Sequence, residues 1–271
     1  KNMKVALIGV GRWGKFLLSE LTKVSEVKYQ CDSKFDLIQV WNDPEVQAVF
    51  IATPTETHFE IAQKALEAGK HVFLEKPCTT NSTDLEKLVN LAKSQNLKLA
   101  VDYEFTHHPA LEKLKELLTG KKIKKVLLEW HKWGTFKDDA VHHLLCHDVS
   151  ILRSLGFEDL TPLIYKCTKV ISNSDIIEVE FKGAKSFINR ASSIKDKTIT
   201  IVTENGGYIM SNNDLFSINT ETQSLDKIEL PDTTPVSLSI QDFLSAIQEN
   251  REPQCNGDFA LEVFKVIEKV K

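Results

Sequence analysis

Three glycines near the start of the chain have a spacing that suits the binding of an anion. Gly9, Gly11 and Gly14 directly follow a short apolar run and open an amphipathic stretch. The first glycine permits a tight strand-to-helix turn, the second lets the backbone approach a pyrophosphate, and the third lets the helix pack on a sheet. Helix N–H groups would then hold the anion. We therefore expect a dinucleotide site, with Arg12 and Trp13 as further cofactor contacts.

An acidic residue follows the second apolar run, where it can contact the adenosine ribose of such a dinucleotide. Asp32 lies about 20 residues beyond the glycines, at the position expected for an acceptor of ribose hydrogen bonds. A carboxylate there would repel a 2'-phosphate, so the sequence favours NAD. Lys34 lies close by and leaves NADP as the alternative.

The elements that must position these residues follow the βαβ pattern of a parallel sheet. We expect a dinucleotide-binding Rossmann domain over residues 1–102, with only a short helix or loop at 33–42. The expected strands are 5–8, 27–31, 48–51, 71–74 and 97–101, and the expected helices are 13–21, 59–68 and 85–92, the last with Thr83 as a possible cap.

The pattern changes after residue 102, because several strand patterns follow one another with only short polar turns between them. Such spacing predicts an α+β domain over residues 103–271 with an open, mainly antiparallel sheet. The expected strands are 126–130, 163–171, 176–181, 186–191, 198–202, 207–210 and 215–218, and the expected helices are 110–118, 144–155, 240–248 and 259–270.

Composition excludes several classes of protein. A formal net charge of -4 gives no global basic field for nucleic acid or an anionic membrane. The five cysteines are scattered without a Cys-x-x-Cys pair, so neither a disulfide framework nor a zinc knuckle is indicated. The first residues lead into a strand pattern without an apolar leader, and no apolar stretch approaches the roughly 20 residues that span a bilayer. We expect a cytoplasmic protein.

Three further motifs resemble those of the Gfo/Idh/MocA oxidoreductase family. They are Thr-Pro-x-x-x-His at 53–58, Glu-Lys-Pro at 75–77, and Phe-Leu-x-Ala-Ile at 243–247 followed by Pro253. Together with the glycine turn they stand in the order found in that family and extend over essentially the whole chain. The resemblance implies an N-terminal Rossmann domain followed by an α/β domain with an open antiparallel sheet, in agreement with the pattern described above.

The resemblance implies two catalytic residues. Lys76 matches the active-site lysine of the family, whose ammonium can stabilise a developing alkoxide beyond the carboxyl end of a strand. In the family, the bond between this lysine and the following proline is often cis. His147 matches the general acid/base, for which an imidazole that titrates near neutrality is suited. The alternatives are a surface lysine before a loop proline and a partly buried structural histidine.

The remaining cofactor contacts are also implied by family position. Thr53, Pro54 and His58 would line the nicotinamide, although His58 could simply cap the start of a helix. Glu75 would bond the nicotinamide ribose, and Lys76 would also contact the cofactor.

Substrate contacts are expected after the last Rossmann strand and around His147. Tyr103 and Glu104 would face the substrate, with ordinary linker packing as the alternative. Many relatives carry an aspartate four residues before the catalytic histidine, where this chain has His143. His147 therefore lacks a partner that would raise its basicity, unless Asp148, His142 or the substrate compensates. His143 and Asp148 are candidate substrate contacts.

His143 and His147 also have the i, i+4 spacing of two helical metal ligands. Two ligands do not make a zinc site, and a third from His131 or Asp148 is conjecture, so we expect no bound metal.

The sequence thus predicts an enzyme that transfers a hydride between a nicotinamide cofactor and a carbinol or carbonyl carbon of a sugar, sugar nucleotide or cyclitol. Trp130, Trp133 and Phe136 could form a sugar-stacking wall, or belong to a core or an interface. The alternative is a non-catalytic NAD(P)-binding sensor or scaffold of the same fold. The open sheet and the family resemblance also predict a homodimer or homotetramer.

Overall fold

The computed structural model describes residues 2–270 and contains two compact units. The first comprises the residues up to Glu104 together with Thr234–Phe264, and the second comprises Phe105–Thr233 together with the residues from Lys265 onward. We expected two continuous domains, 1–102 and 103–271. The difference is the segment 234–264, which belongs to the first unit.

The first unit is built on a five-stranded parallel sheet with the order β2-β1-β3-β4-β5. The five predicted strands are confirmed, with β5 beginning two residues later than expected. Because β2 and β3 lie on opposite sides of β1, the strand order reverses between β1 and β3, where open α/β sheets bind their ligands. The strands are β1 (Lys4–Ile8), β2 (Glu26–Cys31), β3 (Ala48–Ile51), β4 (His71–Leu74) and β5 (Leu99–Val101).

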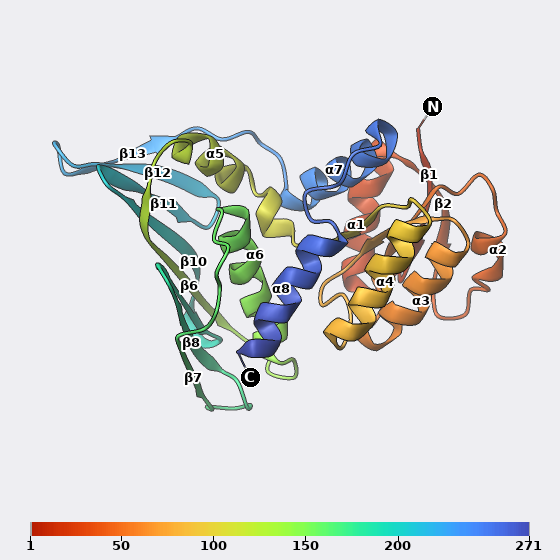
Figure 1. Cartoon of the computed structure of the whole chain (residues 1–271), viewed down its shortest axis with the longest axis horizontal. Coiled ribbons are helices and arrows are strands. Elements are labelled where there is room, and N and C mark those ends of the chain that lie inside the picture. The colour runs from red at the N-terminus through yellow and green to blue at the C-terminus, as the bar shows by residue number, and fades with distance from the viewer. Residues whose placement is uncertain (1, 271) are drawn as a thin grey trace. The chain divides into compact units, whose positions relative to one another are not determined.

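Helices cover both faces of this sheet, and Figure 1 shows α3 and α4 side by side on one of them. The short α2 confirms the abbreviated connection expected at 33–42. The prediction of Thr83 as a cap was wrong: the Asn81 side chain accepts from the backbone N–H of Asp84 at 2.8 Å, so α4 begins at Ser82. The helices are α1 (Arg12–Val24), α2 (Ile38–Trp41), α3 (Thr55–Glu67), α4 (Ser82–Ser94), α7 (Pro235–Glu249) and α8 (Gly257–Lys269), which begins in the first unit.

Helix α7 completes the core of the first unit. It starts with Thr234 as its cap and Pro235 in its first turn, and it packs beside α1. Phe243 lies edge-on to Phe50 of β3 at 5.6 Å between ring centroids and 5.4 Å from Phe73 of β4. These rings share one core cluster with residues of β1, β5 and α1. The first unit therefore depends on a segment far along the chain.

The second unit contains an eight-stranded sheet with the order β13-β12-β11-β10-β6-β9-β8-β7. Strands β6 and β9 are parallel and the other neighbours are antiparallel, so the expected open, mainly antiparallel sheet is confirmed. Strand β13 was not predicted. The strands are β6 (Ile123–Trp133), β7 (Ile164–Thr168), β8 (Ile176–Phe181), β9 (Ala184–Asn189), β10 (Ala191–Thr203), β11 (Gly206–Ser211), β12 (Asp214–Asn219) and β13 (Ser224–Ile228).

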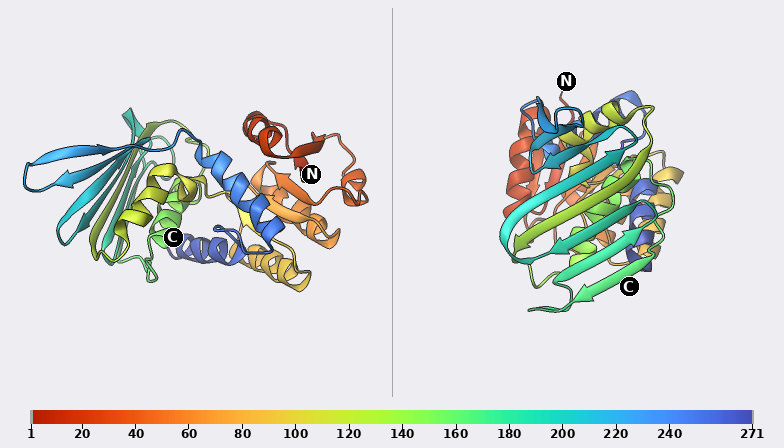
Figure 2. Two further views of the ribbon diagram at one scale, coloured as in Figure 1. Left: turned by 90° about the horizontal axis from the view of Figure 1, so that it is seen from above. Right: turned by 90° about the vertical axis from the view of Figure 1, so that its left-hand side faces the viewer.

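The two faces of this sheet differ in burial. Val126 and Leu128 of β6 are buried beneath the helical layer of the second unit, whereas Leu127 points to the opposite face and is only half-buried. The right-hand view of Figure 2 shows that, among the described residues, no helix of the second unit covers this opposite face. The layer comprises the 3₁₀ helix η1 (Glu104–His107), which begins at the end of the first unit, α5 (Pro109–Leu118), the π-helix η2 (Val141–Leu145) and α6 (Cys146–Ser154).

A buried ion pair holds the loops at one end of the sheet in the second unit. Arg190 and Asp175 are 1% and 0% exposed, and their closest charged atoms are 3.2 Å apart. The Arg190 guanidinium also donates to the carbonyl oxygens of Thr135 and Asp138 at 2.7 and 2.5 Å. One side chain therefore fixes the loop that follows β6. Among residues 2–270, no helix is long and apolar enough to cross a membrane.

Candidate active site

The glycine turn has the backbone geometry expected of a pyrophosphate cradle. Gly9 has φ +98°, and a Cβ atom there would lie 2.5 Å from the Ala52 carbonyl oxygen. A Cβ at Gly14 would lie 1.9 Å from the carbonyl oxygen of Gly9. These two glycines are required by the fold itself. A Cβ at Gly11 would meet no atom within 4 Å, so this glycine borders open space, as the approach of a ligand requires.

The N-terminus of α1 is available to an anion. Gly11 caps the helix without a side-chain hydrogen bond, and the first turn carries no acidic residue. Arg12 and Trp13 are exposed in this turn. The backbone N–H groups and the positive end of the helix dipole therefore suit a diphosphate.

Asp32 stands where a ribose contact is expected, exposed and directly after β2. The Gly9 N–H donates to the Cys31 carbonyl oxygen at 2.9 Å, which ties the glycine turn to the end of β2. One Asp32 carboxylate oxygen accepts from the Lys34 backbone N–H at 2.9 Å. The residues present therefore fit the adenosine half of a dinucleotide.

His58 is buried between two backbone carbonyl groups. Its Nδ1 atom lies 2.9 Å from the Pro77 carbonyl oxygen, and its Nε2 atom lies 2.8 Å from that of Thr53. Burial lowers the pKa of His58, although the neighbouring carbonyl groups oppose this effect. The ring thus connects the turn after β3 with the segment after β4. Thr53 is half-buried and Pro54 is exposed.

Glu75 and Lys76 follow β4 directly. The Lys76–Pro77 peptide bond is cis, and Lys76 is half-buried. Glu75 is buried, and the Trp13 indole N–H donates to its carboxyl group. Burial raises the pKa of Glu75 to about 7, against the effects of the Trp13 hydrogen bond and the Lys76 charge. A carboxyl group that exchanges its proton near neutrality therefore lies beside the candidate catalytic lysine.

Asp102 was missed by the sequence analysis. It directly follows β5, is buried, and accepts a hydrogen bond from the Ser239 hydroxyl of α7 at 2.8 Å. Asp102 also forms a hydrogen bond with Glu75, while the charge of nearby Glu104 helps to raise the pKa of Glu75. The position of Asp102 directly after a parallel strand was a signal that could have identified this residue.

The predicted substrate residue Tyr103 is 2% exposed, with its ring 6.2 Å from that of Phe259 in α8. Glu104 is half-buried. The surroundings of Tyr103 favour the packing role that was its alternative, and substrate contact by either residue stays a prediction.

His147 is buried near the start of α6 and lies among aromatic rings. The Phe105 ring meets the imidazole at 82° with 4.9 Å between centroids, and the Trp130 ring lies 5.7 Å away. The turn before α6 is a π-helix, a local irregularity that is frequent at functional sites. The regular helix predicted for 144–155 gave no sign of it.

The neighbours of His147 have partners within the second unit. Asp148 forms an ion pair with Lys197 at 3.1 Å and accepts from the Ser186 hydroxyl at 2.7 Å. The His142 ring lies 2.8 Å from the Asp139 carboxylate. His143 is half-buried in the π-helical turn. These contacts favour a structural role for Asp148, and substrate contact by Asp148 or His143 stays a prediction.

The described residues provide no assembled metal site: between residues 2 and 270, no group of three or more His, Cys, Asp or Glu side chains could hold a metal ion. The pair His143 and His147 therefore does not gain the third ligand that a zinc site needs.

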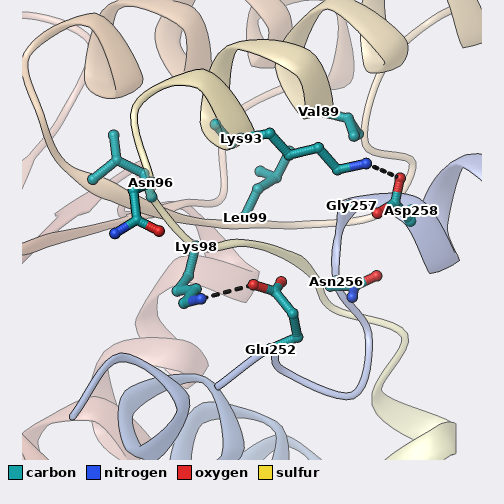
Figure 3. Close-up of a pocket in the computed structure, with 11 residues that line it drawn as sticks. Val89, Lys93, Asn96, Lys98, Leu99, Glu252, Asn256, Gly257 and Asp258 are labelled. Atoms are coloured by element: carbon teal, nitrogen blue, oxygen red, sulfur yellow. Dashed lines mark hydrogen bonds and ion pairs between the residues drawn. The ribbon is translucent and has the colours of Figure 1, made fainter. Parts of the chain in front are cut away.

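A cavity of about 300 Å³ in the first unit lies away from the candidate site (Figure 3). Two ion pairs border it, Lys93 with Asp258 at 2.7 Å and Lys98 with Glu252 at 2.7 Å. It adjoins the amino end of β5, whereas the cofactor residues follow the carboxyl ends of the strands. We therefore assign it no part in the reaction.

Known proteins support this description of the first unit. Residues 19–103 match the model of an oxidoreductase family with an NAD-binding Rossmann fold, GFO_IDH_MocA. A UDP-N-acetylglucosamine 3-dehydrogenase of Acidithiobacillus ferrooxidans is 25% identical over 77% of this chain and 65% of its own length. A dTDP-3,4-didehydro-2,6-dideoxy-alpha-D-glucose 3-reductase of Saccharopolyspora spinosa is 36% identical over 35% of this chain and 29% of its own length. The matches thus span less than two thirds of these relatives.

Solved structures resemble the whole chain. The structure of the Acidithiobacillus ferrooxidans dehydrogenase has a TM-score of 0.88 at 22% identity, covering 100% of this chain and 97% of that chain. An oxidoreductase from Agrobacterium radiobacter, solved with NAD+, L-tartaric acid and magnesium, has a TM-score of 0.86 at 15% identity, covering 99% and 95%.

The fold and the glycine turn define a unit of the NAD-binding Rossmann type. More particularly, residues 19–103 of this unit match the model of the Gfo/Idh/MocA family of oxidoreductases, and the whole chain shares its fold with the Acidithiobacillus ferrooxidans dehydrogenase. The predicted fold class is confirmed, and the match over residues 19–103 supports the predicted family.

Proposed function

We propose that the protein is an NAD-dependent dehydrogenase or reductase that acts on a CH–OH group of a sugar nucleotide or related sugar. The main support is the cradle at Gly11, where open space, uncapped helix N–H groups and the nearby Asp32 fit a dinucleotide. Bound NAD would accept a hydride from the carbinol carbon in oxidation, or return one in reduction. The activities named for the two relatives support a sugar-nucleotide substrate.

In the proposed reaction, two side chains act on the substrate oxygen. During oxidation, His147 takes the hydroxyl proton at an imidazole nitrogen, and it returns this proton in reduction. The Lys76 ammonium stabilises the negative charge that develops on the same oxygen. His58 supports this role of Lys76, because it holds the Pro77 carbonyl that follows the lysine.

The cofactor site is tested by Gly11→Ala. Gly11 has φ -67°, which suits any L-residue, and the added methyl group meets no protein atom within 4 Å. The variant should fold normally but lose NADH affinity by at least about tenfold, a change of roughly 1.4 kcal/mol. Fluorescence titration with NADH measures this loss. An unchanged affinity would contradict the placement of the pyrophosphate.

The reaction is tested by Lys76→Ala in a screen of polyols, sugars and sugar nucleotides. We expect turnover to fall about 100-fold or more, as when a charge-stabilising donor is removed, with NADH binding largely kept. Lys64→Ala, at an exposed position in α3, is the matched control and should keep full turnover. NADH binding by the native protein without turnover on any of these substrates would favour the non-catalytic sensor or scaffold.

We further propose that the protein forms a homodimer or homotetramer through the uncovered face of the sheet in the second unit. Leu127, Phe187, Ile209 and Phe216 occupy neighbouring register positions on this face and are half-buried. An apolar surface of this kind is commonly covered by a second copy. Sedimentation that shows a monomer at micromolar concentration would contradict this assembly.

A further inference from the structure

A buried lysine lies on the same side of the sheet as the candidate acid/base. Lys197 of β10 pairs directly with Trp130 of β6, so the two side chains share one face. This face is the buried one, and Lys197 is only 7% exposed. Lysine is rarely so buried without a partner, so its surroundings require an explanation.

The Lys197 ammonium is held by two rings and a carboxylate. Its Nζ atom lies 3.8 Å from the centroid of the Trp130 ring and 4.3 Å from that of Phe105. The same atom lies 3.1 Å from a carboxylate oxygen of Asp148, whose other oxygen accepts from the Ser186 hydroxyl. The charge is therefore compensated by an ion pair and by cation–π contacts.

His147 contacts the same two rings, Phe105 and Trp130. The imidazole and the ammonium are therefore separated by less than about 10 Å, a distance over which buried charges are only weakly screened. Asp148 is the next residue along the chain. A unit charge at either site would thus change the ease with which His147 takes up a proton.

From this arrangement, and resting on the proposed role of His147, we infer that Lys197 is a positioning residue which cancels the charge of Asp148 and so keeps the imidazole able to accept a proton. With Lys197 present, the pair is neutral and His147 experiences little net field. Without it, the Asp148 carboxylate would favour the imidazolium. Position 143 supplies no carboxylate in this chain.

Other titratable groups lie on the elements that pack around this site. In the π-helical turn, the His142 ring pairs with Asp139. From η1, the His107 ring lies 3.1 Å from the Thr106 hydroxyl, and the His108 ring that follows lies 3.3 Å from the Asn213 side chain. His143 lies one turn before His147. The experiment leaves all of these groups unchanged.

Two single variants and their combination test the charge balance. In Lys197→Met the pH at which His147 protonates should rise by about one unit, and in Asp148→Asn it should fall by a similar amount, as expected for one uncompensated charge near the ring. The double variant Lys197→Met/Asp148→Asn should return it close to the native value. Lys197→Arg, which keeps the charge and can stack on both rings, should leave it unchanged.

The measurement is the NMR titration of ring-labelled histidine in the full chain, with His147→Asn identifying the resonance. It needs no substrate, so it reports on the inference separately from the reaction. In the pH profile of kcat/KM for oxidation, the midpoints of the acidic limb should follow the same order among the native protein and the variants. If the NMR midpoints shift as expected but His147→Asn keeps full turnover, the inference stands and the proposed reaction fails.

Equal midpoints in the native protein and in both single variants would overturn the inference, as would shifts of both in the same direction. A purely structural role would not produce opposite shifts. If Lys197→Met alone fails to fold, the comparison of Asp148→Asn with the double variant still tests the inference. A downward shift of the His147 midpoint in Asp148→Asn that the added Lys197→Met substitution does not reverse would contradict charge cancellation.

Discussion

Glu75 and Asp175 are both buried carboxyl groups, but the two units surround them differently. Glu75 receives one indole N–H, and burial raises its pKa to about 7. Burial would also raise the pKa of Asp175, but hydrogen bonds from the Ser172 hydroxyl and three backbone N–H groups hold it below its usual range, and the Arg190 guanidinium pairs with it. The first unit thus keeps an exchangeable proton beside the cofactor residues, whereas the second uses a fixed charge to hold its loops.

The largest effect is expected from Arg190→Met. The substitution leaves the Asp175 carboxylate buried without its cation and frees the loop carbonyls of Thr135 and Asp138. Loss of one partner of a buried ion pair lowers the free energy of unfolding by about 3 to 5 kcal/mol, a change that urea unfolding measures. Lys185→Met, which removes a half-exposed cation paired with Glu178, is the control and should cost less than about 1 kcal/mol. Similar losses in both variants would contradict the comparison.

Glu75→Gln should have an effect that depends on pH. Because the pKa of Glu75 is raised from 4.5 to about 7, the native state holds more protons than the unfolded state between these values. Native stability therefore falls as pH rises through this window and levels off above it. Glutamine cannot ionise, so the free energy of unfolding of the variant should equal that of the native protein at pH 4.5. At pH 8 it should exceed the native value by up to about 3 kcal/mol. Unfolding curves that differ by the same amount at every pH would exclude this behaviour.

The smallest effect is expected from Trp13→Phe, which removes the indole donor to Glu75. That hydrogen bond lowers the pKa of Glu75, so its loss should raise this pKa above 7. The pH range over which native stability falls should then extend above 7. The free energy of unfolding should fall by about 1 kcal/mol at pH 8 and by less at pH 5, where the Glu75 carboxyl group is protonated. Urea unfolding at the two pH values measures the difference, and an equal loss at both would indicate a change in packing alone.

Local patterns were sufficient to predict the parallel sheet and the glycine turn of the first unit, but not that residues 234–264 belong to it. The glycine spacing followed a strand pattern, and steric limits at Gly9 and Gly14 leave few other conformations, so the turn was found where expected. The predicted ends of elements were less accurate, because the Asn81 side chain, and not that of Thr83, caps α4 by accepting a hydrogen bond from the backbone N–H of Asp84. Cap choice depends on small differences in backbone geometry that composition does not encode.

The second unit could be predicted only in outline, because its contacts join distant parts of the chain. Lys197 meets Trp130 only through the pairing of β10 with β6, and neither residue carries a local signal of that register. Asp148 was expected near the substrate, yet the same pairing gives it a lysine partner. The contact of Asp102 with Ser239 likewise depends on α7 packing in the first unit. Tertiary register, and not residue type, decided these roles.

The position of residues 234–264 has a consequence for the order of events during synthesis. The Val101 N–H donates to the Cys255 carbonyl oxygen, and Phe243 completes the core beneath β3 and β4. Domains commonly fold from the N-terminus as the chain leaves the ribosome. Here the nucleotide-binding unit cannot finish until residues 234–264 have emerged, so a nascent chain that ends at Glu104 would expose the apolar sheet face that α7 covers.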